Sequence, residues 1–158
     1  MYTMDVLRRS VQNNDAPSVR ILLRYYQHDI NDSDSDGNTA LILAACEHNI
    51  EIVRMLLKIT HIDVNRRNNQ GYTALMFASS KGGHIGIVRM LLNVQNTDMN
   101  LVDNEANTAI MFAAFLGDIE IVRAIASSSD LRMQNKYGKT ALTYAIEGRH
   151  QDIICLLE

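Results

Sequence analysis

Three aspartates alternate with other residues between Asn31 and Gly37, in the stretch NDSDSDG. Carboxylates with this spacing, followed by glycine, open the calcium-binding loop of helix–loop–helix proteins. Such a loop also needs a bidentate carboxylate at its last position, and Leu43 stands there. The sequence therefore favours an acidic connecting loop over a calcium site.

No other reactive side chains form a recognisable catalytic or metal-binding set. The histidines show neither an H-x-x-x-H nor an H-E-x-x-H pattern, so zinc is not expected. Ser127–Ser129 lack the G-x-S-x-G context of a nucleophile, and the glycines match no phosphate-binding loop. We therefore predict that the chain is not an enzyme and needs no cofactor.

The composition restricts the partners and the compartment. The 158 residues carry a net charge of −3 and no long run of Lys or Arg, which argues against nucleic acid as a partner. The longest apolar run, ALILAAC, is too short to cross a membrane. Cys46 and Cys155 form no C-x-x-C pair, so we expect a reducing compartment. The cytoplasm is the first expectation, with the nucleus or a host cytosol as alternatives.

Two motifs recur at a common period. The first reads GNTAL from Gly37, GYTAL from Gly71, ANTAI from Ala106 and GKTAL from Gly138, at spacings of 34, 35 and 32 residues. The second reads IEIVRMLL from Ile50, IGIVRMLL from Ile85, IEIVRAIA from Ile119 and QDIICLLE from Gln151. Self-similarity at such a period is typical of stacked repeats.

Each period divides into the same elements. A threonine in the first motif is placed to cap a helix of small apolar residues, and the four are Thr39, Thr73, Thr108 and Thr140. A short break follows, at His48-Asn49, Gly82-Gly83, Gly117-Asp118 and around Gly148, because Gly and Asn tolerate the left-handed backbone that ends a helix. The second motif predicts a second helix, and a polar link leads to the next copy.

Helix, turn, helix and extended link, with G-x-T-A-L at the start of the first helix, resemble the ankyrin repeat family. The resemblance covers residues 4 to 158 and implies an all-α solenoid of stacked helix-turn-helix units joined by β-hairpin or loop connections. We expect a single ankyrin repeat domain over residues 1–158, with repeats at 4–35, 36–68, 69–103, 104–135 and 136–158. The first repeat is degenerate, and Arg8, Arg9 and Gln12 are predicted to form its solvated outer face.

The resemblance also implies where a partner binds, because the family uses the concave face formed by hairpin tips and first helices. By register, the predicted binding residues are Asp36, Asn38, Tyr72, Lys81, Glu105, Asn107, Phe115, Leu116, Tyr137 and Lys139. Phe115 and Leu116 are predicted anchors because their counterparts in the other copies are mostly polar; the alternative is that both fold inward or pack on the neighbouring hairpin. Tyr72 and Tyr137 are expected to flank Phe115.

Two functional hypotheses follow. The first is a monomeric, non-enzymatic scaffold that binds a protein partner, with Asp36, Lys81, Glu105 and Lys139 setting charge complementarity. The second, suggested by the end of the chain at Glu158, is a recognition module of a larger catalytic or transport protein, or a host-targeted effector or inhibitor. The family also implies that Asn65 and Asn100 are candidates for asparagine hydroxylation, against a structural role in the turn.

Overall fold

A computed structural model describes residues 2–25, 29–80 and 84–158. Lys81, Gly82 and Gly83 lie outside the described residues. Within the described part, ten helices form five successive pairs. These are α1 (Tyr2–Gln12) with α2 (Ala16–Leu22), α3 (Ala40–Cys46) with α4 (Ile50–Leu56), α5 (Ala74–Ser80) with α6 (Ile85–Leu92), α7 (Ala109–Leu116) with α8 (Ile119–Ala126), and α9 (Ala141–Glu147) with α10 (Gln151–Leu157).

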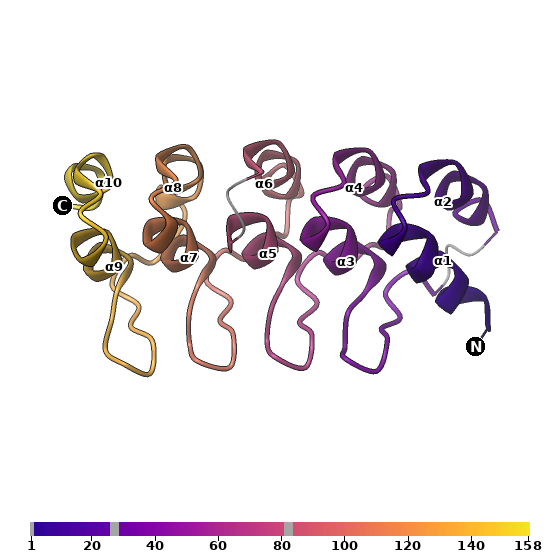
Figure 1. Cartoon of the computed structure of the whole chain (residues 1–158), viewed down its shortest axis with the longest axis horizontal. Coiled ribbons are helices and arrows are strands. Elements are labelled where there is room, and N and C mark those ends of the chain that lie inside the picture. Colours follow the sequence, from indigo (N-terminus) through magenta and orange to yellow (C-terminus); the bar gives the residue numbers. More distant parts are fainter. Residues whose placement is uncertain (1, 26–28, 81–83) are drawn as a thin grey trace.

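The helix pairs stack side by side in one direction, as Figure 1 shows. The first helices of the pairs, from α1 to α9, form an inner row, and the second helices, from α2 to α10, form an outer row. Each helix contacts the equivalent helix of the next pair. This confirms the predicted helical solenoid. No helix in the described ranges is long and apolar enough to span a membrane.

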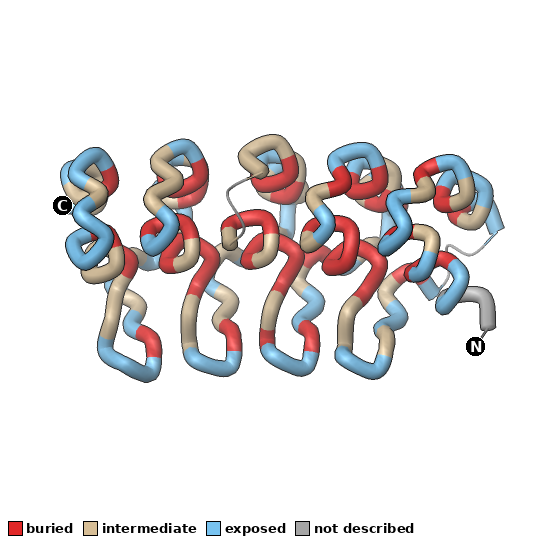
Figure 2. Tube along the Cα trace, viewed as in Figure 1, coloured by how far each residue is buried: buried red, intermediate tan, exposed pale blue. Residues whose placement is uncertain are grey.

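The core runs the whole length of the stack between the two rows (Figure 2). Ala44, Ala78 and Ala113 are completely buried in the inner helices, where their small side chains let neighbouring helices approach closely. Ile52 and Ile87 are equally buried at equivalent positions of the outer helices. Each pair thus buries its apolar side against its neighbours, which is what gives a repeat array its stability.

Most of the helices begin with a side-chain cap, and three of the four predicted threonine caps are confirmed. The hydroxyls of Thr39 and Thr73 accept the amides three residues on, at 3.3 and 3.2 Å, and Thr140 forms a capping box with Thr143. Thr108 also precedes its helix in extended conformation, but its buried Oγ1 makes no hydrogen bond within the described residues. The predicted cap at Thr108 is therefore wrong as regards its side chain.

In each pair whose turn lies in the described residues, that turn contains a residue in the left-handed region. His48 and Gly117 occupy this place with φ of 56° and 77°, as predicted. In the last pair the left-handed residue is Arg149, with φ of 57°, whereas Gly148 has φ of −77°. This agrees with the break predicted around Gly148, and it shows that glycine alone does not fix which residue takes the left-handed conformation.

Tight loops project below the inner helices and repeat one hydrogen-bonding scheme (Figure 1). Asp34, Asn68, Asp103 and Asn135 are equivalent residues, and each accepts two backbone amides, two and four residues on, at 2.7–3.0 Å. Asp34 thus takes the same structural role as Asn68, an amide that could not serve as a calcium carboxylate. The only β-bridge in the described ranges joins Ser33 to Thr39, so these loops are hairpin-like turns rather than stranded hairpins.

The loop tips also bind one another along the stack. The amides of Asn69, Asn104 and Lys136 donate to the carbonyls of Asp36, Gln70 and Glu105 at 2.9–3.0 Å. We refer to this row of tips as the hairpin row. Its backbone-to-backbone bonds require close approach, and Gly37 and Gly71 permit it: a Cβ on Gly71 would lie 2.8 Å from the backbone of Asp103 and Asn104.

Ala106 stands in this row where the neighbouring copies have glycine, and it keeps their left-handed backbone, with φ of 63°. A Cβ in this region costs about 1–2 kcal/mol, part of which glycine offsets through greater freedom in the unfolded chain. Ala106→Gly is therefore expected to stabilise the fold by about 0.5–1 kcal/mol. Urea denaturation followed by circular dichroism at an unchanged m-value tests this; lower stability would show that the alanine methyl packs favourably on the next tip.

The two ends of the stack differ in polarity. Arg9 and Gln12 are exposed on α1 as predicted, but Arg8 is only 7% exposed because it pairs with Asp5 and donates to the Asp32 carbonyl. Its predicted solvated position is therefore wrong. On α9, Ile146 is 54% exposed, whereas its counterparts Ala45 and Ala114 are completely buried by the following helix pair. This end of the inner row leaves apolar side chains uncovered.

Candidate functional site

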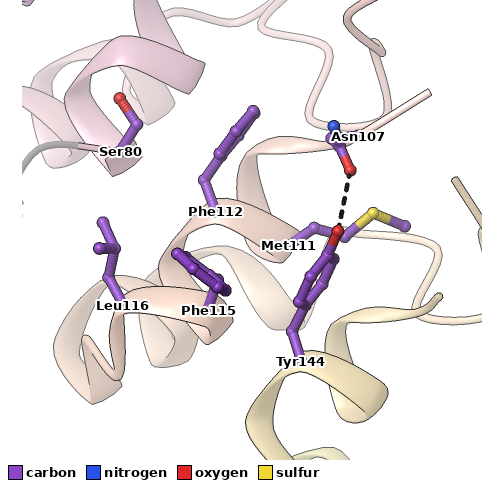
Figure 3. A pocket seen from close by; sticks show the side chains of 7 residues that line it. All are labelled: Ser80, Asn107, Met111, Phe112, Phe115, Leu116 and Tyr144. Atoms are coloured by element: carbon purple, nitrogen blue, oxygen red, sulfur yellow. Dashed lines mark hydrogen bonds between the residues drawn. The ribbon is translucent and has the colours of Figure 1, made fainter. Parts of the chain in front are cut away.

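A groove opens on the inner row where α5, α7 and α9 lie next to one another. Its volume is about 320 Å³. The lining residues, shown in Figure 3, are Ser80, Asn107, Met111, Phe112, Phe115, Leu116 and Tyr144. Most of this surface is apolar, and α7 supplies the largest share. We call it the α7 groove.

Phe115 and Leu116 form the exposed part of the α7 groove. Phe115 is 60% exposed and Leu116 is 42% exposed at the C-terminal end of α7. Both side chains remain accessible, which excludes the alternative that they fold into the core. Adjacent exposed apolar side chains on an otherwise well-packed helix are the kind of surface that protein partners cover.

Tyr144 forms a fixed wall beside Phe115. Its ring meets the Phe115 ring edge to face, with 5.6 Å between the centroids. Its hydroxyl accepts a hydrogen bond from Asn135 Nδ2 at 2.8 Å and donates to Asn107 Oδ1 at 3.5 Å, the bond drawn in Figure 3. These contacts hold the ring in one orientation, so this wall is ordered before anything binds.

Tyr72 joins the groove through Phe112 and not by direct contact with Phe115. The Tyr72 ring lies 5.4 Å from the Phe112 ring and 5.0 Å from the Phe77 ring, measured between centroids. Burial raises the pKa of Tyr72, and the nearby Asp103 carboxylate raises it further. Phe77, Tyr72 and Phe112 thus form an aromatic row that extends the apolar surface of the groove.

Two of the four charged residues predicted to select a partner, Glu105 and Lys139, are paired within the protein. The Tyr137 hydroxyl donates to Glu105 at 3.1 Å, and this hydrogen bond, with the carboxylate charge, raises the pKa of Tyr137. Lys139 Nζ donates to Glu147 at 2.7 Å, which raises the pKa of Lys139. Tyr137 is 69% exposed on the hairpin row and does not line the groove. These pairs form a polar rim beside an apolar centre.

Asp36 is exposed at the tip of its loop, and its carboxylate forms no ion pair within the described ranges. Asp36 belongs to the loop before α3, and in the stack the α3–α4 pair is separated from α7 by the α5–α6 pair (Figure 1). Asp36 is therefore distant from the α7 groove. The predicted residues therefore do not form one cluster. Lys81 falls outside the described residues.

Asn38 and Asn107 use their side chains inside the stack. Asn38 Oδ1 accepts from Asn68 Nδ2 at 2.9 Å, and Asn107 Oδ1 accepts from Asn135 Nδ2 at 2.7 Å, in each case between neighbouring loops. Asp103 is equivalent to the donors Asn68 and Asn135 but has no amide group to donate, and the residue equivalent to the acceptor Asn38 is there Tyr72. Partner binding by Asn38 and Asn107 stays a prediction. Their side chains have a structural role, because each is hydrogen-bonded to the neighbouring loop.

Neighbouring loops are also joined by the side chains of three asparagines that each end a D-x-N sequence, Asn31, Asn65 and Asn100. Asn65 Nδ2 donates to the Asn96 carbonyl at 2.6 Å, and its Oδ1 accepts from the Asp98 amide at 2.9 Å. Asn31 makes the same two bonds to His61 and Asp63, and Asn100 accepts from the Asp130 amide. Because both ends of the Asn65 amide are used, it holds neighbouring loops at a fixed spacing.

Phe112, Tyr144 and Met111 were not predicted as site residues. Phe77 and Phe112 recur at the same place in their copies, and such periodic recurrence is typical of core packing. Met111 is indeed 2% exposed, but Phe112 and Tyr144 are only half-buried. The sequence did indicate that Phe112 belongs to the site, because it precedes Phe115 and Leu116 by one helical turn and therefore lies on the same side of the helix.

Comparison with known proteins agrees with the geometry of the stack. The family model described as ankyrin repeats (3 copies) matches residues 7–103 and again residues 80–158. Together the two matches extend over nearly the whole chain. No curated protein matches the sequence.

Proposed function

Because the chain belongs to the ankyrin repeat family, whose members generally mediate protein–protein interactions, we propose that it is a non-enzymatic scaffold that binds a protein partner at the α7 groove. The observation that carries the proposal is the exposed Phe115, with 60% of its surface accessible, against a ring held in place by two hydrogen bonds. A partner side chain would cover both rings at once.

The size and polarity of the groove suggest what the partner inserts. A volume of about 320 Å³, lined mainly by apolar side chains, suits one or two large aliphatic or aromatic side chains. Burial of such a side chain contributes about 1.5–3 kcal/mol. The Glu105–Tyr137 and Lys139–Glu147 pairs offer polar groups at the edge, as expected for an interface with an apolar centre and a polar rim.

The family match leaves the compartment and the oligomeric state to be proposed. The sequence has two cysteines, Cys46 and Cys155, which form no C-x-x-C pair. This supports the cytoplasm as the compartment. We propose that the protein acts as a monomer, with repeat boundaries as given above, because the α7 groove and the hairpin row need no second copy to be complete.

A selection from a random peptide library on phage tests the proposal. Peptides enriched on the immobilised protein are expected to share a large apolar residue and to compete with one another. Phe115→Asp should weaken their binding at least about tenfold, which corresponds to about 1.4 kcal/mol, because a carboxylate would be desolvated in the interface. The thermal transition should remain nearly unchanged, since Phe115 lies outside the core.

Ile146→Asp is the matched control for this variant. It also introduces a carboxylate at a half-exposed apolar residue, but Ile146 does not line the groove. If the peptides bound the two variants with equal affinity, whether unchanged or weakened, the result would contradict the α7 groove as the site. Unfolding of Phe115→Asp would place Phe115 in the core and contradict its role as an anchor.

A further inference from the structure

A second groove lies on the outer row, on the opposite layer from the α7 groove. It runs between α2 and α4 with a volume of about 450 Å³. Its lining residues are Arg20, Leu23, Arg24, Glu51, Arg54, Met55, Lys58 and Ile59. Four basic side chains thus stand against a single carboxylate, on a chain whose net charge is −3. We call it the α2–α4 groove.

The one carboxylate in the α2–α4 groove is already paired. Arg20 Nη2 lies 2.8 Å from Glu51 Oε1. Arg24, Arg54 and Lys58 are exposed and form no ion pair within the described ranges. Arg54 and Lys58 also line a neighbouring groove of about 270 Å³ between α4 and α6, so these two cations stand on the ridge between the two hollows.

The missing carboxylate has a specific place in the repeat. Arg20, Arg54 and Arg89 are equivalent residues of the second motif, and Arg20 pairs with Glu51 and Arg89 with Glu120 of the following copy. The corresponding residue for Arg54 is Gly86. A Cβ built on Gly86 would meet only Ile50 Cδ1, at 3.8 Å, so space for a side chain exists and is unused.

We infer that the α2–α4 groove is a second interaction surface, which binds an acidic segment of a protein partner. Carboxylates of that segment would take the place of the absent partner of Arg54 and would also neutralise Arg24 and Lys58. An apolar side chain between them would rest on Met55 and on the edges of Leu23 and Ile59. The charged contacts would make the surface selective for acidic segments, and the apolar contact at the centre would add to the affinity.

A protein segment fits this surface better than a membrane or a nucleic acid. Glu120 and Asp152 are exposed further along the same row, so from α8 onward the cation Arg123 is accompanied by carboxylates, whereas, within the described residues, the α2–α4 groove has three unpaired cations together. A long uniform polyanion would be repelled beyond that point, since its binding depends on a continuous series of cations. A short acidic segment meets only the cationic part.

Gly86→Glu is the decisive variant. It supplies the carboxylate that the repeat lacks, and it should keep the fold because glutamate favours a helix over glycine by roughly 0.5–1 kcal/mol. Gly86→Gln is the matched control, with the same shape and helix preference but no charge. The probe is a fluorescein-labelled helical peptide with glutamates one turn on either side of a leucine, measured by fluorescence anisotropy at low salt.

The wild-type protein and Gly86→Gln should bind the peptide with equal affinity, and Gly86→Glu should bind it about tenfold more weakly, with binding lost as salt rises. Equal affinity of the Glu and Gln variants, or no binding to wild type, would overturn the inference. Tighter binding to phosphatidylserine vesicles or to a single-stranded oligonucleotide than to the peptide would also overturn it. Phe115→Asp should bind this peptide normally, which separates this surface from the α7 groove.

Discussion

Gly71→Ala is expected to lower the free energy of unfolding by about 3 kcal/mol. Gly71 has φ of 85°, a conformation that costs an alanine about 1–2 kcal/mol. The new Cβ would also lie 2.8 Å from Asn104 N and from Asp103 Cα, and forced repacking of this kind costs about 1–3 kcal/mol. Both obstacles are backbone atoms, so the next loop must move.

The movement would break the bond from the Asn104 amide to the Gln70 carbonyl, which joins two neighbouring loops. Because each repeat is stabilised only by its neighbours, a weakened junction lets the two sides unfold separately. Urea denaturation should therefore show a lower midpoint and a broader or two-step transition. This loss of cooperativity distinguishes a broken junction from uniform destabilisation.

Gly138→Ala is the control that isolates the backbone strain. Gly138 has φ of 70°, but no atom lies within 4 Å of a Cβ there, because no further loop packs against this one. We expect a cost of about 1 kcal/mol and a transition of unchanged sharpness. Equal costs for the two variants would show that close packing of the hairpin row contributes nothing at Gly71.

Asn68→Ala is expected to cost about 3 kcal/mol, by a different mechanism. Asn68 is 9% exposed, its Oδ1 accepts the amides of Gln70 and Tyr72, and its Nδ2 donates to Asn38. Removing the side chain leaves the two amides and Asn38 Oδ1 without partners and poorly hydrated, and it also removes the bonds that hold the turn. The unsatisfied groups together cost about 1–3 kcal/mol. The measurement is again urea denaturation, with circular dichroism and fluorescence of the tyrosines compared.

Asn68→Asp separates the two halves of this role. A carboxylate can still accept both amides, as Asp34 and Asp103 do in their own loops, but it cannot donate to Asn38. We expect a cost of about 1 kcal/mol, the size of one net hydrogen bond. If the aspartate variant were as unstable as the alanine variant, the bond to Asn38 and not the turn would dominate.

The repeat pattern was sufficient to predict the helices and most of the caps. Recurring Thr39 and Thr73 predicted helix starts because a cap depends on atoms only a few residues away. The break around Gly148 was predicted, but the left-handed conformation falls on Arg149. The choice between adjacent residues depends on how the second helix packs, which local preference does not contain. Arg8 was misjudged because its burial results from Asp32, across the first connecting loop.

The candidate site was predictable only in part. Phe115 and Leu116 were identified because they interrupt a polar place in the register, and their exposure follows from that register. Tyr144 was missed, since its position beside Phe115 results from the stacking of α9 on α7. Likewise Asn107 was predicted as a partner-binding residue, and its hydrogen bond with Asn135 of the following loop could not be seen in the sequence.

The sequence by itself therefore determined the fold, because a repeated motif imposes the same local contacts on every copy and leaves each copy one way to bury its apolar side. Tertiary structure decided which residues are available to a partner. Availability depends on side chains supplied by the neighbouring copy, such as Glu51 beside Arg20 or the bare Gly86 that follows Arg54. Those neighbours are about one repeat away in sequence, and only stacking brings them into contact.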